Sequence, residues 1–253
     1  MADLKGVYTK IDRAKTHLDD FNDQVRPIEA ACKKAIVREC DEQRSEYVFR
    51  LDHVPDIPAN LSAILGDAIH NLRVSLDHLM WQLVIASKGS PDENTSFPLL
   101  TVPPTPNRYG RSLPNVHPGI PRKMRMVLDE VQPYKRSNPA HHELAIIDKL
   151  DIRDKHRELL IAVMGSEGGG GFFGDAEFVN FNFGPYNDGD EVARFTCPPA
   201  NSKSEPNISF FFAVRFDEPA AGPWGKTLGA SKVVRNSLRY IEDEVLPRFR
   251  CFF

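Results

Sequence analysis

The sequence predicts an α+β fold, with a helical bundle around a long central helix (about 60–88) and an antiparallel β-sheet. Apolar residues recur at helical spacing through the first two-thirds of the chain. Near the end the period changes to two, which is typical of strands, and a short N-terminal segment also reads as a hairpin. We expect one domain over residues 1–253, divisible into a mainly helical part (1–163) and a β-rich part with a C-terminal helix (164–253).

The N-terminal segment predicts one helix followed by a hairpin. Its apolar residues lie three or four apart, and the helix is expected to end before Pro27, since proline interrupts helical hydrogen bonding. The segments "KAIVREC" and "EYVFRLD" flank the polar "DEQRS" and predict two paired strands. The apolar positions of the helix are Leu4, Val7, Ile11, Ala14, Leu18 and Phe21.

The central helix is expected to begin at an Asn60 N-cap and to end near Lys88, with Gly89 as its C-terminal cap. Residues 90–120 are rich in proline and predict a long surface connection. Two further helices are expected over "PRKMRMVLDEV" and "HHELAIIDKLDIRDKHRELLIAV".

The last third begins with "GSEGGGGFFGD", which we expect to be a flexible glycine loop. Three strands follow, in "EFVNFNF", "EVARFT" and "ISFFFAVRF", and the turn-rich "GPYNDGD" joins the first two. A final helix is expected over about 227–246. It should bury Leu228, Val234, Leu238, Ile241 and Val245.

Composition excludes several classes of protein. The net charge of −3 is not that of a polycation built to coat nucleic acid or anionic lipid. The four cysteines form no C-x-x-C pair, so a disulfide framework is not expected. No run approaches 18 apolar residues and the first residues lack a secretory signal pattern, so we expect a cytoplasmic protein with no membrane partner.

The stretch "GDAIHNLRVSLDHLMWQL" (66–83) carries the most informative pattern. On a helical wheel most of its apolar residues form one continuous arc, and its polar residues form the opposite arc, which also contains Val74 and Trp81. These polar residues are types that form hydrogen bonds, titrate or coordinate, whereas a solvated face usually carries Lys, Glu and Gln. A functional site and a set of buried structural pairs are both consistent with them. They are Asp67, His70, Asn71, Arg73, Asp77 and His78.

A second cluster, "DIRDKHREL", lies on the helix expected over 141–163. Dense alternating charge on a helix is often surface pairing. If the two helices pack together, however, the aspartates of one could pair with the basic groups of the other. We call this expected contact between the two helices the polar seam. Its members from the second helix include Asp154, Lys155, His156 and Arg157.

Three functional hypotheses follow from these residues. The seam could be catalytic without a metal, or it could be structural in a non-catalytic binding or regulatory protein. It could also hold one or two metals of a hydrolase, although no H-E-x-x-H or comparable pattern is present. The imidazoles and carboxylates for such a metal site would be Asp67, His70, Asp77, His78, His141, His142 and His156.

The ordered motifs "IDRAKTHLDDF", "GDAIHNLRVSLDHLMWQL", "FPLL", "QPY" and "DKHRELL" resemble a widespread family of uncharacterised bacterial and phage-associated proteins. The resemblance covers most of the first 163 residues and implies no established activity. Separately, Arg73 and His78 fit the R-x4-6-H pattern of the HEPN superfamily of small helical domains. Many HEPN domains are metal-independent ribonucleases of toxin–antitoxin and phage-defence systems.

The HEPN resemblance implies roles for two residues. His78 would take the proton from an RNA 2′-hydroxyl, and Arg73 would hold the scissile phosphate. It implies a homodimer, RNA as substrate and no metal or other cofactor; the basic residues within 108–136 could guide the RNA. The binding-protein hypothesis instead implies a protein partner, such as an antitoxin or a phage or host factor. Supporting or substrate-binding residues would be Asp67, His70, Asn71, Asp77, Asp154, Lys155, His156 and Arg157.

Overall fold

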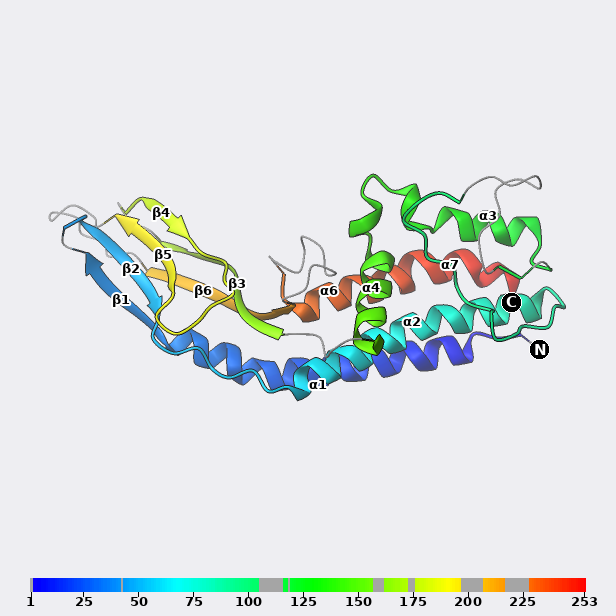
Figure 1. The fold of residues 1–253 in the computed structure, drawn as a ribbon, viewed down its shortest axis with the longest axis horizontal. Coiled ribbons are helices and arrows are strands. Elements are labelled where there is room, and N and C mark those ends of the chain that lie inside the picture. The colour runs from blue at the N-terminus through cyan, green and yellow to red at the C-terminus, as the bar shows by residue number, and fades with distance from the viewer. Residues whose placement is uncertain are drawn as a thin grey trace.

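The fold is α+β, as predicted, and the molecule is elongated (Figure 1). The sheets lie at one end and most helices at the other, where both chain termini also lie. One continuous cluster of buried apolar side chains runs through helices and strands. This computed structural model describes residues 2–41, 43–104, 116–117, 119–156, 162–172, 176–196, 207–216 and 228–253.

Helix α1 (Lys5–Lys34) runs along the molecule to the sheets and is longer than predicted. The expected end before Pro27 is wrong, because the helix continues through this proline for two more turns. Asp23 and Pro27 are both exposed, so water can solvate the carbonyl that the proline leaves without a helical donor. Beyond it, Cys32 is fully buried, and this burial favours continuation of the helix.

The predicted N-terminal hairpin is confirmed as β1 (Ile36–Asp41) and β2 (Glu46–Leu51). Together with β5 (Glu191–Thr196) and β4 (Phe178–Phe181) it forms an antiparallel sheet in the order β1-β2-β5-β4. The sheet therefore joins an N-terminal hairpin to C-terminal strands, as the sequence indicates.

A second, two-stranded sheet pairs β3 (Ala162–Phe172) with β6 (Asn207–Phe216). The expected glycine loop is wrong, since Gly165–Gly171 lie inside β3. The helix predicted over 141–163 does not reach residue 163, because β3 begins at Ala162. Phe210, Phe212 and Phe216 of β6 pack into the core and provide the burial that the glycines of β3 lack, whereas Phe211 is exposed.

Aromatic side chains join the two sheets. The ring of Phe49 on β2 lies 5.9 Å from the ring of Phe195 on β5 and 5.3 Å from the ring of Phe210 on β6. The inner faces of the sheets therefore pack as a small sandwich over the end of α1.

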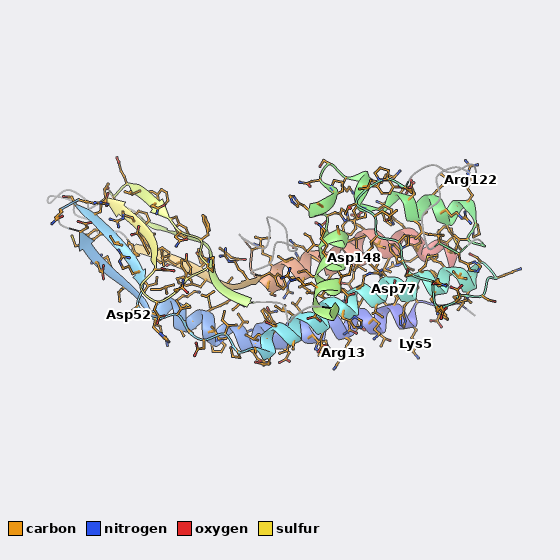
Figure 2. All side chains as sticks on the ribbon, in the orientation of Figure 1. Lys5, Arg13, Asp52, Asp77, Arg122 and Asp148 are labelled. Carbon is orange, nitrogen blue, oxygen red and sulfur yellow. The ribbon has the colours of Figure 1, made fainter. Side chains whose placement is uncertain are left out.

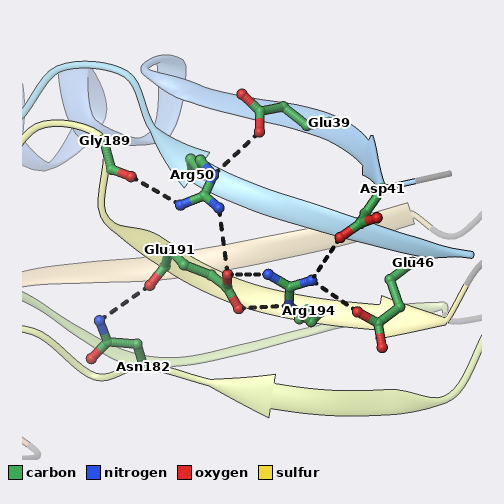
Figure 3. A network of polar contacts seen from close by, with 8 residues as sticks. All are labelled: Glu39, Asp41, Glu46, Arg50, Asn182, Gly189, Glu191 and Arg194. Atoms are coloured by element: carbon green, nitrogen blue, oxygen red, sulfur yellow. Dashed lines mark hydrogen bonds and ion pairs between the residues drawn. The ribbon is translucent and has the colours of Figure 1, made fainter. Parts of the chain in front are cut away.

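The outer face of the four-stranded sheet carries a network of ion pairs (Figure 3). Arg194 binds Glu191 in a bidentate manner at 3.0 and 2.7 Å and donates to Glu46 at 2.8 Å. Arg50 donates to Glu39 at 3.2 Å and lies 3.7 Å from Glu191, whose pKa Arg194 lowers. The arginines thus link β1, β2 and β5, which gives this cluster a structural role.

The central helix is α2 (Asn60–Ala86), antiparallel to α1 and packed against it. Asn60 is the first helical residue rather than the cap, and its side chain donates to Gln24 of α1. At the other end Lys88, not Gly89, adopts the left-handed conformation (φ 59°). The N–H groups of Lys88 and Gly89 bond to the carbonyls of Ile85 and Val84, which is a Schellman motif.

The remaining helices cover α2 and complete the helical end. These are α3 (Arg122–Glu130), the short turns η1 (Pro133–Lys135) and η2 (Pro139–His141), and α4 (Glu143–His156), which crosses α2. The predicted C-terminal helix is observed as α6 (Ala230–Arg239), a π-helical segment η4 (Tyr240–Val245), α7 (Leu246–Phe249) and η5 (Arg250–Phe252). Of the five residues it was expected to bury, Leu228 is only partly buried and the other four are buried.

Candidate functional site

The polar side of α2 faces α4 and the segment around Phe97, and Arg73 lies at the centre of this contact. Each of its three guanidinium nitrogens donates one hydrogen bond. Nε donates to Asp148 at 3.0 Å, Nη1 to Asp77 at 2.6 Å and Nη2 to the carbonyl of Phe97 at 3.2 Å. The side chain is 12% exposed. Arg73 therefore ties α2 to α4 and to the loop that follows α2.

Asp77 completes this arrangement from the next turn of α2. Its Oδ1 accepts from Arg73 and also from the backbone N–H of Phe97, at 2.9 Å. The residues Arg73 and Asp77 thus hold both backbone polar groups of Phe97. The Phe97 ring is buried and lies 6.4 Å from the ring of Phe249 in α7. Arg73 and Asp77 therefore fix the position of Phe97, whose ring packs in the helical core.

Asp148 is the partner of Arg73 on α4, and the two carboxylates that bind Arg73 lie in the helical half of the molecule (Figure 2). Burial raises the pKa of Asp148, and the adjacent Arg73 guanidinium opposes this rise. The Arg73 guanidinium thus stabilises the charged form of the partly buried Asp148 carboxylate.

Two further aspartates of α4 lie against α2. Asp151 is 5% exposed and its Oδ1 lies 3.0 Å from Nδ1 of His70. The carboxylate of Asp154 lies over Gly66, where a Cβ would come within 2.5 Å of Oδ1. Glycine at this position therefore permits the close approach of α4 to α2.

Sequence reasoning named Asp154 among the supporting residues but missed Asp148, the partner of Arg73. A usable signal was present, since Asp148, Asp151 and Asp154 are three residues apart and therefore share one face of a helix. The polar seam between the two helices is thus present as a contact, with a different set of aspartates at its centre.

Asn71 and Asp67 lie on the side of α2 toward α1. The amide of Asn71 donates to the carbonyl of Asp67 at 2.8 Å and accepts from Lys10 of α1 at 3.4 Å. Asn71 is buried, whereas the side chain of Asp67 is exposed. Within the described part of the chain, the hydrogen bonds of Arg73 go to other residues than these two.

His78 lies on another side of α2 from Arg73. Its ring packs on Gly6 of α1, where a Cβ would lie 2.8 Å from Nδ1. It also lines a pocket of about 300 Å³ with Asp77, Trp81, Gln82 and Thr95. Since positions 73 and 78 are roughly 140° apart on a helix, one copy of α2 does not converge their side chains.

The remaining predicted residues cannot be placed in the site. The side chains of Lys155 and His156, at the end of α4, and the whole of Arg157 lie outside the described residues. In the part of the chain that the structure describes, no group of three or more His, Cys, Asp or Glu side chains is arranged to hold a metal ion. None of the described helices is long and apolar enough to cross a membrane.

His141 and His142, which the metal hypothesis included, lie apart from α2. His142 is buried beside Tyr240, with ring centroids 4.6 Å apart, and burial lowers its pKa. Its Nδ1 accepts from the N–H of Leu144, which helps to begin α4. His141 pairs with Asn138 at 2.7 Å within η2 and its flanks.

No family model, curated protein or solved structure matches the chain.

Proposed function

We propose that the chain is a non-catalytic binding or regulatory protein in which the polar side of α2 holds the helical end together. One observation carries the proposal: all three nitrogens of Arg73 donate to groups of the same chain. An arginine that binds a phosphate presents its planar fork to the anion. If Arg73 did so, Asp77 and Asp148 would lose their shared cation, which is costly for partly buried carboxylates.

The HEPN-type ribonuclease, which is the first function that the sequence suggests, becomes the second candidate here, and one observation favours it. His78 lines an open pocket, so an RNA strand could reach its imidazole. In a single chain, however, Arg73 bonds toward α4 while His78 packs on α1. The ribonuclease would therefore need the arginine and the histidine of two copies to meet at one phosphate.

The basic residues expected to guide RNA support this second candidate only weakly. Lys135 pairs with Asp129, and Arg136 donates to the hydroxyl of Tyr240 at 3.2 Å. Arg122 and Lys123, which lie on α3, are exposed. Residues 105–115, which include two further arginines of this segment, lie outside the described part of the chain.

Incubation of the full chain with total RNA in EDTA separates the two candidates. The matched variant is His78→Ala, with folding checked by circular dichroism. We expect no cleavage by either protein, in EDTA or after addition of manganese or zinc. Cleavage by the wild type alone, leaving cyclic-phosphate ends, would overturn the proposal in favour of the metal-independent nuclease.

A further inference from the structure

The pocket beside His78 is a candidate ligand site on the helical end of the molecule. Four of its five lining residues come from two turns of α2, at positions 77, 78, 81 and 82, and Thr95 closes it from the following loop. Its volume of about 300 Å³ is at the lower end of the range of small-molecule sites. The pocket therefore suits a small group rather than a large ligand.

Trp81 is the large aromatic side chain that lines this pocket. The residue is 42% exposed, although it lies on a helix whose other large apolar side chains are mostly buried. An exposed indole next to a pocket leaves a π face open to a ligand. Asp77 is four residues earlier on α2, so its carboxylate and the indole are neighbours on one helical face.

The charge around the pocket favours a cation. Neither lysine nor arginine lines it, and the side chain of Asp77 is 32% exposed. Both hydrogen bonds described for Asp77 end on Oδ1, so its Oδ2 is the oxygen that a ligand would approach.

Two lining residues bond to aspartates that do not line the pocket, and the carboxylate of Asp3 accepts from the N–H of Lys5 at the start of α1. Gln82 accepts from the N–H of Asp3, and Thr95 donates to the carboxylate of Asp92. Asp77 is the carboxylate among the lining residues, and while Arg73 pairs with its Oδ1 at 2.6 Å, its Oδ2 can attract a positively charged ligand.

We infer that this pocket binds an organic cation, a guanidinium or alkylammonium group, which lies on the face of Trp81 and pairs with Asp77. An aromatic face beside a carboxylate is a recurring arrangement for such groups. This inference rests on the proposed function, because it names the class of ligand that the proposed binding protein would bind. A free amine and a basic side chain of a partner protein share this chemistry.

The test is a ligand-observed NMR titration of the full chain with four probes. These are tetramethylammonium, an acetylated and amidated Gly-Arg-Gly peptide, the same peptide with citrulline in place of arginine, and AMP. We expect both cations to bind and the uncharged citrulline peptide and AMP not to bind. Tighter binding of the arginine peptide than of tetramethylammonium would assign the site to a partner's side chain, and the reverse order to a free alkylammonium ion.

The deciding variant is Trp81→Ala, because this exposed side chain can be removed without opening the core. It should weaken cation binding by about two- to five-fold. Asp77→Asn should also weaken binding, and Asp52→Asn, an equal change of charge at the sheet end, should leave it unchanged (Figure 2).

Equal binding of the citrulline peptide, preferential binding of AMP, or unchanged binding by Trp81→Ala would overturn the inference. The RNA assay is independent of these results. A chain that cleaves no RNA and binds no cation would refute this inference and leave the proposed function standing.

Discussion

Replacing Arg73 by alanine tests whether the polar side of α2 is structural. The change removes three hydrogen bonds, two of them to carboxylates whose side chains are 28% and 32% exposed. Each partner left without its donor costs about 1–3 kcal/mol when buried, and water can reach these carboxylates in part. We therefore expect the free energy of unfolding to fall by about 2–3 kcal/mol.

The loss should depend on pH, because Asp148 stays behind without its cation. Burial already raises the pKa of Asp148 above its ordinary value of 3.8, and removal of Arg73 should raise it further. A carboxyl group with a raised pKa in the folded state binds its proton more readily there than in the unfolded state. Such a group lowers stability as the pH rises above 3.8. The destabilisation should therefore be larger at about pH 7 than at about pH 4.

Urea unfolding followed by circular dichroism measures both effects. Arg13→Ala, which removes an exposed arginine of α1 (Figure 2), is the matched control and should change stability by less than about 0.5 kcal/mol. Arg73→Lys should recover only part of the loss, since an ammonium cannot serve three partners in this planar geometry. Equal small losses for Arg73→Ala and Arg13→Ala would refute the reasoning.

Three further predictions concern other parts of the fold, each measured as a free energy of unfolding. Gly165→Ala should lower the free energy of unfolding by about 2–3 kcal/mol, because the added Cβ would lie 2.0 Å from the buried Arg215 side chain. Gly170→Ala is the matched control and should be nearly neutral, because the atom nearest to its added Cβ lies 3.8 Å away. Lys88→Gly should stabilise by about 0.5–1 kcal/mol because position 88 has a positive φ, and Lys34→Gly, at a regular helical position, should not. Burial lowers the pKa of His142, so stability should fall as the pH drops below 6.5, and less steeply in His142→Gln; equal slopes would contradict this.

The sequence predicted those elements whose apolar period is regular. The buried positions of α1 and the strands around Phe49 and Phe195 follow directly from spacing. Two errors arose where tertiary packing overrides local preference. Pro27 stays inside α1, where Cys32 beyond it is buried, and the glycines of β3 form a strand because β6 pairs with them.

The candidate site was predicted as a set of residues but not as a geometry. The helical wheel placed Arg73 and His78 on one polar arc, yet it could not say which neighbour each would contact. That depends on where α4 and α1 pack, which is set by long-range contacts such as Asp148 to Arg73 and Gly6 to His78. The sequence shows that the aspartates of α4 are three residues apart and share one face. It does not show which residues of α2 lie opposite them.

The most direct test of the central assignment is the side-chain ¹⁵N–¹H NMR signal of the Arg73 Nε–H group, identified by its loss in Arg73→Lys. If this group donates to Asp148, its proton should exchange slowly with water, and the signal should not move when an RNA oligonucleotide is added. Rapid exchange, together with a shift of this signal on RNA addition, would show that the guanidinium is available to a phosphate. That result would contradict a structural role for the polar side of α2.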